Sequence, residues 1–488
     1  MRGIHLSPSG WRAIIAKEFT FDNILFLAQA IADYLKQQAG KEYASSLSGV
    51  VVGYDCRFLS DEFAGCVAEV LAGNQINVFF VPVPTPTPVI AYEIVRRGAA
   101  AGIMITASHN PPMYNGLKFN APHGGSNSKE ATAWITNQAN TMRNTMIKRI
   151  TYQQGITSGV ILPVEPAEKY LEHMKTLINM ELIKEAGLSV AIDPMFGCAI
   201  EYLGNILTCA GCRVVSIHTN RDPLFGGRSP DPNEDSLQEL SQLVVSSNSC
   251  LGLATDGDAD RFGIIDSDGK YISSNQMIAL LVHYMLKTRG QKGEARGIVK
   301  TITTTHLIDA IAKKYNVPCA ETNVGFRNVA KIMRKENMLI GGEESGGLTI
   351  AGHIPEKDGI LGCLLTVEML ASESLDKKDK KSVRDILQGL YEEFGYFFTK
   401  RMDMCISKEE MGVLSESLQH NPLKRFGDLQ VTRVENNKFF IEDGSWLLIR
   451  QSATEPLIRI YAEAASQDRL HKLMEAGMGF ICKKVDKI

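Results

Sequence analysis

Apolar runs typical of buried strands alternate with amphipathic runs typical of helices along most of this 488-residue chain. One series extends from a strand at 50–53 to a strand at 101–106, and similar series occupy 188–255 and 274–341. Strands that alternate with helices form mainly parallel sheets, and the loops at the carboxyl ends of the strands are the usual place for function. The sequence therefore predicts three similar α/β domains with mixed, mainly parallel sheets.

The pattern changes after a charged stretch at 375–381. Beyond it the sequence predicts helices and a strand, then three or four alternating strands between residues 429 and 464, and a closing helix at 467–484. Adjacent strands with flanking helices are typical of an α+β domain with an antiparallel sheet. The predicted domains are 1–160, 161–270, 271–380 and 381–488.

Composition narrows the classes of function. Hydrophobic residues make up 44% and charged residues 22%, as in globular proteins, and a formal net charge of only -3 gives no overall basic surface for nucleic acid. The longest apolar run, at 277–286, is too short to cross a bilayer, and the first residues lack the apolar core of a signal peptide. Ten cysteines are too dilute for a disulfide scaffold. We expect a cytoplasmic protein with no nucleic-acid or membrane partner.

Two further patterns favour structural interpretations. Cys209 and Cys212 are the one cysteine pair at metal-ligand spacing, but they lie where a helix ends, which favours packing over a zinc or redox site. Prolines at alternate positions from Pro82 to Pro88 favour a rigid turn over a partner-binding motif.

The strand that ends the first series leads into residues 106–112, Thr-Ala-Ser-His-Asn-Pro-Pro. Asn110 and the two prolines prevent continuation as strand or helix, so they predict a turn that exposes Ser108 to solvent. An exposed serine beside His109, with Lys118 ten residues on, is a candidate nucleophile. The alternative is an ordinary Ser/Asn/Pro turn.

The strand at 251–255 is followed by Asp256, Asp258 and Asp260. Carboxylates at alternate positions can converge on one hard cation, and Gly257 lets the backbone bend around it. The loop lacks the later glycine and glutamate of an EF-hand, whereas three oxygen ligands leave room for a phosphate oxygen, as in many Mg²⁺ sites. The alternative is a solvated acidic turn, in which the three carboxylates would repel one another.

A third loop carries groups that suit a sugar. Glu343 and Ser345 follow the strand at 338–341 and could present acceptors to adjacent sugar hydroxyls. Lys357 lies on a nearby turn, where a solvated charge is the alternative interpretation.

A fourth loop, at 450–456, carries groups that suit a phosphate. Arg450 and Arg459 supply charge, while Ser452 and Thr454 supply hydroxyl donors. Together with exposed backbone N–H groups these residues could form a phosphate cradle, and a structural turn is the alternative.

In combination, these loops resemble those of the α-D-phosphohexomutase family. The matching segments occur in the family's order and cover essentially the whole chain: 9–12, 106–112, 256–261, 342–346 and 450–456. The resemblance implies a heart-shaped enzyme of four domains, with one loop from each domain lining a central cleft. It also implies that the serine is phosphorylated, that the phosphoserine and the three aspartates bind Mg²⁺, and that the last two loops bind the sugar and its phosphate.

The site residues indicated by the loops and by the resemblance fall into three groups. The catalytic candidates are Ser108, Lys118, Lys357, His109 and Arg12. The metal candidates are Ser108, Asp256, Asp258 and Asp260. The substrate-binding candidates are Arg261, Gly325, Glu343, Ser345, Arg450, Ser452, Ala453, Thr454 and Arg459. Lys118 and Lys357 are expected to share proton transfer, with a pKa lowered by neighbouring cations, and His109 is the alternative.

The predicted reaction is the interconversion of glucose 1-phosphate and glucose 6-phosphate through a phosphoserine enzyme and a hexose 1,6-bisphosphate, which also primes the enzyme. Mannose and glucosamine phosphates are alternative substrates. The preference for glucose comes from segments 342–346 and 356–359, which resemble those of phosphoglucomutases. A phosphatase is disfavoured by the dedicated sugar and phosphate loops, and a silent binding protein by the complete set of chemical groups. The expected partners are small sugar phosphates, and the expected assembly is a monomer or homodimer.

Overall fold

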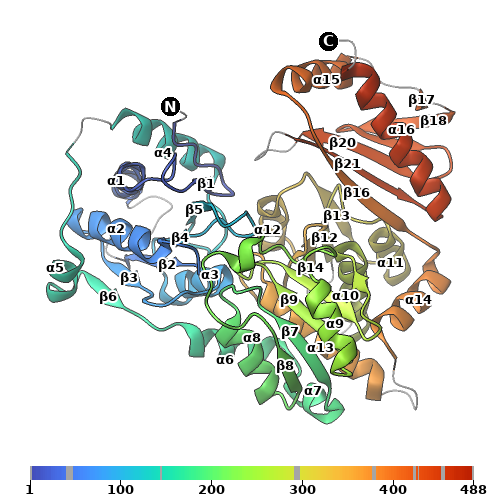
Figure 1. Ribbon diagram of the computed structural model, residues 1–488, viewed down its shortest axis with the longest axis horizontal. Helices are drawn as coiled ribbons and strands as arrows, with labels where there is room; N and C mark the ends of the chain where they lie inside the picture. The colour runs from blue at the N-terminus through green and yellow to red at the C-terminus, as the bar shows by residue number, and fades with distance from the viewer. Residues whose placement is uncertain are drawn as a thin grey trace. The chain divides into compact units, whose positions relative to one another are not determined.

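The computed structural model describes residues 3–39, 48–142, 146–290, 297–375, 381–420, 425–426, 428–451 and 457–485. The chain divides into two compact units, and Figure 1 traces it from blue at the N-terminus to red at the C-terminus. The first unit comprises Met1–Thr301 and Ala320–Arg384, and the second comprises Ile302–Cys319 and Asp385–Ile488. None of the helices in the described ranges is long and apolar enough to cross a membrane.

The first sheet of the first unit has the strand order β1-β5-β4-β2-β3-β6. Its strands are β1 (Trp11–Ile14), β2 (Val50–Tyr54), β3 (Val78–Phe80), β4 (Ala101–Ile105), β5 (Tyr114–Asn120) and β6 (Ile161–Pro163). β2 is parallel to β3 and β4, whereas β5 is antiparallel to β4 and β1. The accompanying helices are α1 (Phe21–Gln38), α2 (Ser60–Gly73), α3 (Thr87–Arg97), α4 (Lys129–Thr141) and α5 (Tyr152–Thr157).

Two further sheets complete the pattern of the three α/β domains. The second has the order β11-β10-β9-β7-β8, and the third has the order β13-β12-β14-β15. Their strands are β7 (Ser189–Asp193), β8 (Arg213–Ser216), β9 (Leu251–Thr255), β10 (Phe262–Asp266), β11 (Tyr271–Ile272), β12 (Gly297–Thr301), β13 (Cys319–Thr322), β14 (Met338–Glu343) and β15 (Gly347–Ile350). Their helices are α6 (Ala167–Leu177), α7 (Met180–Ala186), α8 (Ile200–Cys209), α9 (Gln238–Ser246), α10 (Ser274–Thr288), α11 (Leu307–Tyr315), α12 (Phe326–Lys335) and α13 (Gly359–Leu375).

The second unit contains an antiparallel sheet with the order β16-β21-β20-β19-β18-β17. Its strands are β16 (Phe398–Cys405), β17 (Arg425–Phe426), β18 (Leu429–Glu435), β19 (Lys438–Ile441), β20 (Trp446–Gln451) and β21 (Leu457–Ala464), and its helices are α14 (Val383–Phe394), α15 (Lys408–His420) and α16 (Gln467–Val485). The core of this unit is formed by apolar residues of the sheet and of α15 and α16, including Leu447, Ile460 and Leu473.

The second unit also includes α11, which precedes the rest of the unit in sequence. Lys438 is fully buried, donates to the carbonyl of Ile302 at 2.9 Å, and lies 4.2 Å from the centre of the Trp446 ring. Glu463 accepts from the indole Nε1 of Trp446 at 2.7 Å and from the backbone N–H of His306 at 3.1 Å. Buried charges need such partners, so these contacts fasten Ile302–Cys319 to the C-terminal sheet.

The predicted fold class is confirmed, with three α/β domains that have mixed sheets and a C-terminal domain with an antiparallel sheet. The sequence prediction missed α13, whose residues from Gly359 to Ala371 are all buried, because a helix that is apolar on every side has no amphipathic period. The domain limits at residues 160, 270 and 380 remain predictions. Residues 376–380, within the charged stretch, lie outside the described residues.

Candidate active site

Ser108 lies in the turn between β4 and β5. Its backbone is left-handed, with φ of 53°, a conformation that costs energy for any residue other than glycine and persists only where surrounding contacts hold it. The prediction that Ser108 is exposed is wrong, because none of its surface is accessible. The hydroxyl instead donates to Asp256 Oδ2 at 2.8 Å, so the turn is covered by the aspartate loop.

Arg57 holds this turn through hydrogen bonds to backbone carbonyl oxygens. Its guanidinium donates to the carbonyl oxygens of Ser108 and Asn110, both at 2.6 Å, and to those of Pro111 and Tyr114, both at 2.9 Å. The side chain is fully buried, and its Nε lies 3.2 Å from Asp55 Oδ2. Sequence reasoning missed Arg57, although a charged pair directly after the buried strand β2 was an available signal.

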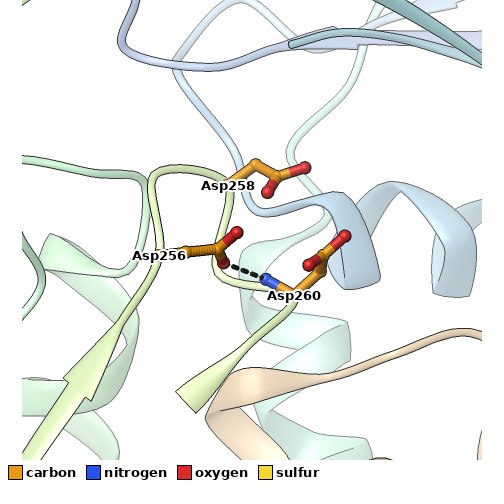
Figure 2. Close-up of side chains that lie close together, drawn as sticks. All are labelled: Asp256, Asp258 and Asp260. Atoms are coloured by element: carbon orange, nitrogen blue, oxygen red, sulfur yellow. Dashed lines mark hydrogen bonds between the residues drawn. The ribbon is translucent and has the colours of Figure 1, made fainter. Parts of the chain in front are cut away.

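The three aspartates converge after β9, as Figure 2 shows. One carboxylate oxygen from each of Asp256, Asp258 and Asp260 lies within 4.8 Å of the others, and all three side chains are buried. Asp256 Oδ1 accepts from the backbone N–H of Asp260 at 2.8 Å, which closes the loop. A Cβ atom at Gly257 would lie 2.9 Å from the carbonyl oxygen of Ser108, so only glycine permits this close approach to the serine turn.

The aspartate cluster fits a hard divalent cation. Among the described residues, Asp258 Oδ1 is a buried carboxylate oxygen with no hydrogen-bond partner, and such an atom is costly unless a ligand occupies the space in front of it. Burial, followed by the charges of Asp260 and Asp258, raises the pKa of Asp256 well above its usual range. Oxygen atoms are the ligands that Mg²⁺ prefers, and a divalent cation would relieve the repulsion between these carboxylates.

Two lysines contact the same cluster. Lys118 Nζ lies 2.5 Å from Asp258 Oδ2 and 2.7 Å from Asp260 Oδ2, and Lys357 Nζ lies 3.0 Å from Asp260 Oδ1. The expectation that cations lower the pKa of Lys118 is wrong in this structure. Burial disfavours its charge, but the carboxylates of Asp258 and Asp260 outweigh burial and raise the pKa above its usual value.

His109 and Arg12 also contact the serine turn. His109 Nδ1 is 3.3 Å from the Ser108 hydroxyl oxygen, and burial together with the charges of Arg261 and Arg12 lowers the pKa of His109 well below its usual range. The imidazole is therefore neutral at neutral pH. Arg12 donates to Asn110 Oδ1 at 2.6 Å, which ties β1 to the turn.

Four of the predicted substrate-binding residues also belong to the first unit. Glu343 ends β14, is buried, and accepts from the Ser345 hydroxyl at 2.7 Å. Gly325 precedes α12 with φ of 114°, which glycine alone adopts readily. Arg261 lies 3.5 Å from Asp231 Oδ1.

The predicted phosphate loop belongs to the second unit. Arg450 on β20 is paired in register with Arg459 on β21, and Arg459 Nε lies 3.4 Å from Asp403 Oδ2. Ser452, Ala453 and Thr454 lie outside the described residues.

Among the described residues, Cys209 and Cys212 belong to no group of three or more side chains that could hold a metal ion. Cys209 is exposed and Cys212 is buried, both as free thiols. Within the described ranges, the aspartates are the one group of three or more metal-ligating side chains.

Family models match the chain in four consecutive parts. They are described as phosphoglucomutase/phosphomannomutase alpha/beta/alpha domains I, II and III and C-terminal domain, and they match residues 5–146, 168–269, 273–394 and 414–478 respectively.

Relatives match over nearly their full length. The phosphoglucomutase/phosphomannomutase of Thermococcus kodakarensis is 30% identical over 475 residues, which are 96% of each chain. The phosphoglucosamine/phosphogalactosamine mutase of Sulfurisphaera tokodaii is 28% identical over 467 residues, covering 95% of this chain and 96% of the relative. The open-form crystal structure of Paramecium pp63/parafusin, a phosphoglucomutase, shares the fold, with a TM-score of 0.82, 22% identity and coverage of 100% of this chain and 95% of that chain. The four matching domains and these relatives show that the chain belongs to the phosphoglucomutase/phosphomannomutase family of phosphohexomutases, which are phosphoryl-transferring mutase enzymes.

Proposed function

We propose that this phosphohexomutase interconverts hexose 1-phosphate and hexose 6-phosphate through a phosphorylated Ser108 and a hexose 1,6-bisphosphate. The observation that carries the proposal is the 2.8 Å contact between the Ser108 hydroxyl and Asp256, one of three converging carboxylates. This contact puts the hydroxyl that would carry the phosphoryl group beside the donor set that would hold a cation.

Groups around the turn would have to compensate the negative charge of a phosphoserine. A phosphoryl group on Ser108 brings a charge of about −2 at neutral pH, next to the carboxylate of Asp256. Mg²⁺, held by the phosphoryl group and the aspartate cluster, would neutralise this charge and polarise the phosphorus–oxygen bonds. Arg57 would keep the turn in place through its four carbonyl contacts.

In each half-reaction the phosphoryl group passes from one oxygen atom to another. The free hydroxyl of the sugar phosphate forms a bond to phosphorus while the bond to the Ser108 oxygen breaks. The sugar hydroxyl proton passes to a base, and the Ser108 oxygen takes up a proton and becomes a hydroxyl again. The bisphosphate then turns over, and the reverse step returns its other phosphoryl group to Ser108. Glu343 and Ser345 would bind the sugar hydroxyls in both orientations, and the loop at 450–456 would bind the phosphate that is not being transferred.

We assign proton transfer to Lys118 and Lys357. The raised pKa of Lys118 keeps its ammonium charged, so Lys118 would donate hydrogen bonds to the reacting oxygen atoms, and Lys357, whose Nζ lies 3.0 Å from Asp260 Oδ1, is the second member of the pair. Lys118→Ala and Lys357→Ala are each expected to lower kcat by roughly 10²- to 10⁴-fold, the usual size of an acid–base contribution. Single-turnover transfer from the phosphorylated enzyme would measure this step directly. If both variants keep near-normal rates while His109→Gln loses orders of magnitude, the role belongs to His109.

The preferred substrate is proposed to be glucose phosphate. Glu343 and Ser345 would contact hydroxyls that glucose and mannose share, so mannose should be tolerated, and the names of the relatives support mannose and glucosamine as well as glucose. A coupled assay primed with the matching bisphosphate should give a higher kcat/KM for glucose 1-phosphate than for mannose or glucosamine 1-phosphate. The reverse order would reject the preference and leave the mutase reaction standing.

A further inference from the structure

The proline-rich segment before α3 reaches the aspartate cluster. Residues 81–86 form no helix or strand, and Thr87 is the first residue of α3, followed by Pro88. Proline at the start of a helix is compatible with helical geometry and restricts the backbone of its neighbours. The alternating prolines therefore restrict the backbone that positions Thr87.

Thr87 contacts Asp258 through both its backbone and its side chain. The backbone N–H of Thr87 donates to the Asp258 carbonyl oxygen at 2.9 Å, and the Thr87 hydroxyl donates to Asp258 Oδ2. Thr87 is 1% exposed and Asp258 is fully buried, so water does not compete for these bonds. The contacts join residues that are 171 positions apart.

The two oxygens of the Asp258 carboxylate have different surroundings. Oδ2 accepts from Thr87 and from Lys118, which also donates to the Thr87 hydroxyl at 3.4 Å. Oδ1 has no hydrogen-bond partner among the described residues. A carboxylate whose one oxygen is held by a hydroxyl cannot rotate freely, so its other oxygen keeps a constant direction.

We propose that Thr87 is a positioning residue for the metal centre. Its hydroxyl orients the Asp258 carboxylate so that Oδ1 faces the cation. This inference rests on the metal site in the proposed function. Hydrogen bonds to the outer oxygen of a ligating carboxylate fix ligand geometry, and their loss typically costs about 10- to 100-fold in metal affinity. A buried hydroxyl that needed only a hydrogen-bond acceptor could have donated to any nearby carbonyl oxygen.

The test is Mn²⁺ binding to the full chain, measured by the electron paramagnetic resonance signal of free Mn²⁺, with the phosphorylation state of each sample checked by mass spectrometry. Thr87→Val keeps the shape of the side chain and removes the hydroxyl, and it should raise the Kd for Mn²⁺ by about tenfold or more. Thr87→Ser restores the hydroxyl and should return the Kd to within about twofold of the unsubstituted value.

Thr85→Val is the matched control, because the Thr85 hydroxyl in the same segment donates to the carbonyl of Val83 and not to the aspartate loop. Its Mn²⁺ affinity should be unchanged. Unchanged affinity in Thr87→Val, or equal losses in Thr87→Val and Thr85→Val, would overturn the positioning role while the metal centre stands. Absence of Mn²⁺ binding by the unsubstituted chain would overturn the metal centre, and this inference with it.

Discussion

Replacement of Ser108 by alanine is expected to lower kcat by roughly 10⁴-fold or more, because it removes the hydroxyl that is proposed to carry the phosphoryl group between the two half-reactions. The loss should appear in kcat and not in KM, since Ser108 is buried against Asp256 and the substitution removes one hydroxyl. A coupled assay measures the rate. Intact-mass measurement after incubation with hexose 1,6-bisphosphate should show one added phosphoryl group on the unsubstituted chain and none on the variant.

The matched control for this experiment is Ser246→Ala. Ser246 is an exposed serine at the end of α9 in the same unit, and it should keep both normal turnover and normal phosphorylation. Full turnover by Ser108→Ala, or phosphorylation of that variant at another residue with retained activity, would contradict the phosphoserine mechanism.

Loss of the cation is expected to have an effect of similar size. Asp258→Ala removes the carboxylate that offers a free buried oxygen, and it should abolish measurable Mg²⁺ or Mn²⁺ binding and lower kcat by roughly 10³-fold or more, since the ion would otherwise stabilise the transferring charge. Chelation of the unsubstituted enzyme should give the same loss and be reversed by added Mg²⁺. Calorimetric titration with Mn²⁺ measures the binding.

Asp235→Ala is the control for Asp258→Ala, because Asp235 is an exposed carboxylate of the same unit outside the cluster. It should bind the cation normally. Activity that survives exhaustive chelation, or an intact metal site in Asp258→Ala, would show that the aspartates have another role.

Local pattern was sufficient to predict most of the framework. The strand β9 was predicted residue by residue, because all five of its residues are buried and the apolar run stops where Asp256 begins. The convergence of the three aspartates also followed from local geometry, since alternate residues in a bent loop can turn their side chains to one point. The antiparallel strand β5 escaped prediction because its residues, YNGLKFN, include polar residues and a glycine and give no clear apolar run.

Contacts between distant residues were beyond the sequence. The burial of Ser108 depends on Asp256, 148 positions away, and the turn itself is held by Arg57, which lies 51 positions before Ser108. The charge state of Lys118 likewise depends on Asp258 and Asp260, which the sequence placed in a different domain. The pattern of residues within one segment does not predict which charged groups of a distant segment will contact it.

The discontinuous second unit has a consequence for how the chain is made. Lys438 needs the carbonyl of Ile302, which is synthesised 136 residues earlier, and Glu463 needs His306. At about 5–20 residues per second, Ile302 waits roughly 7–27 s on the ribosome before its partner is made. A gene fragment that begins at residue 381 would encode the whole antiparallel sheet and still leave a buried ammonium without the carbonyl that it binds. The C-terminal sheet is therefore not an independent unit. Exchanging it between relatives requires Ile302–Cys319 to be exchanged with it.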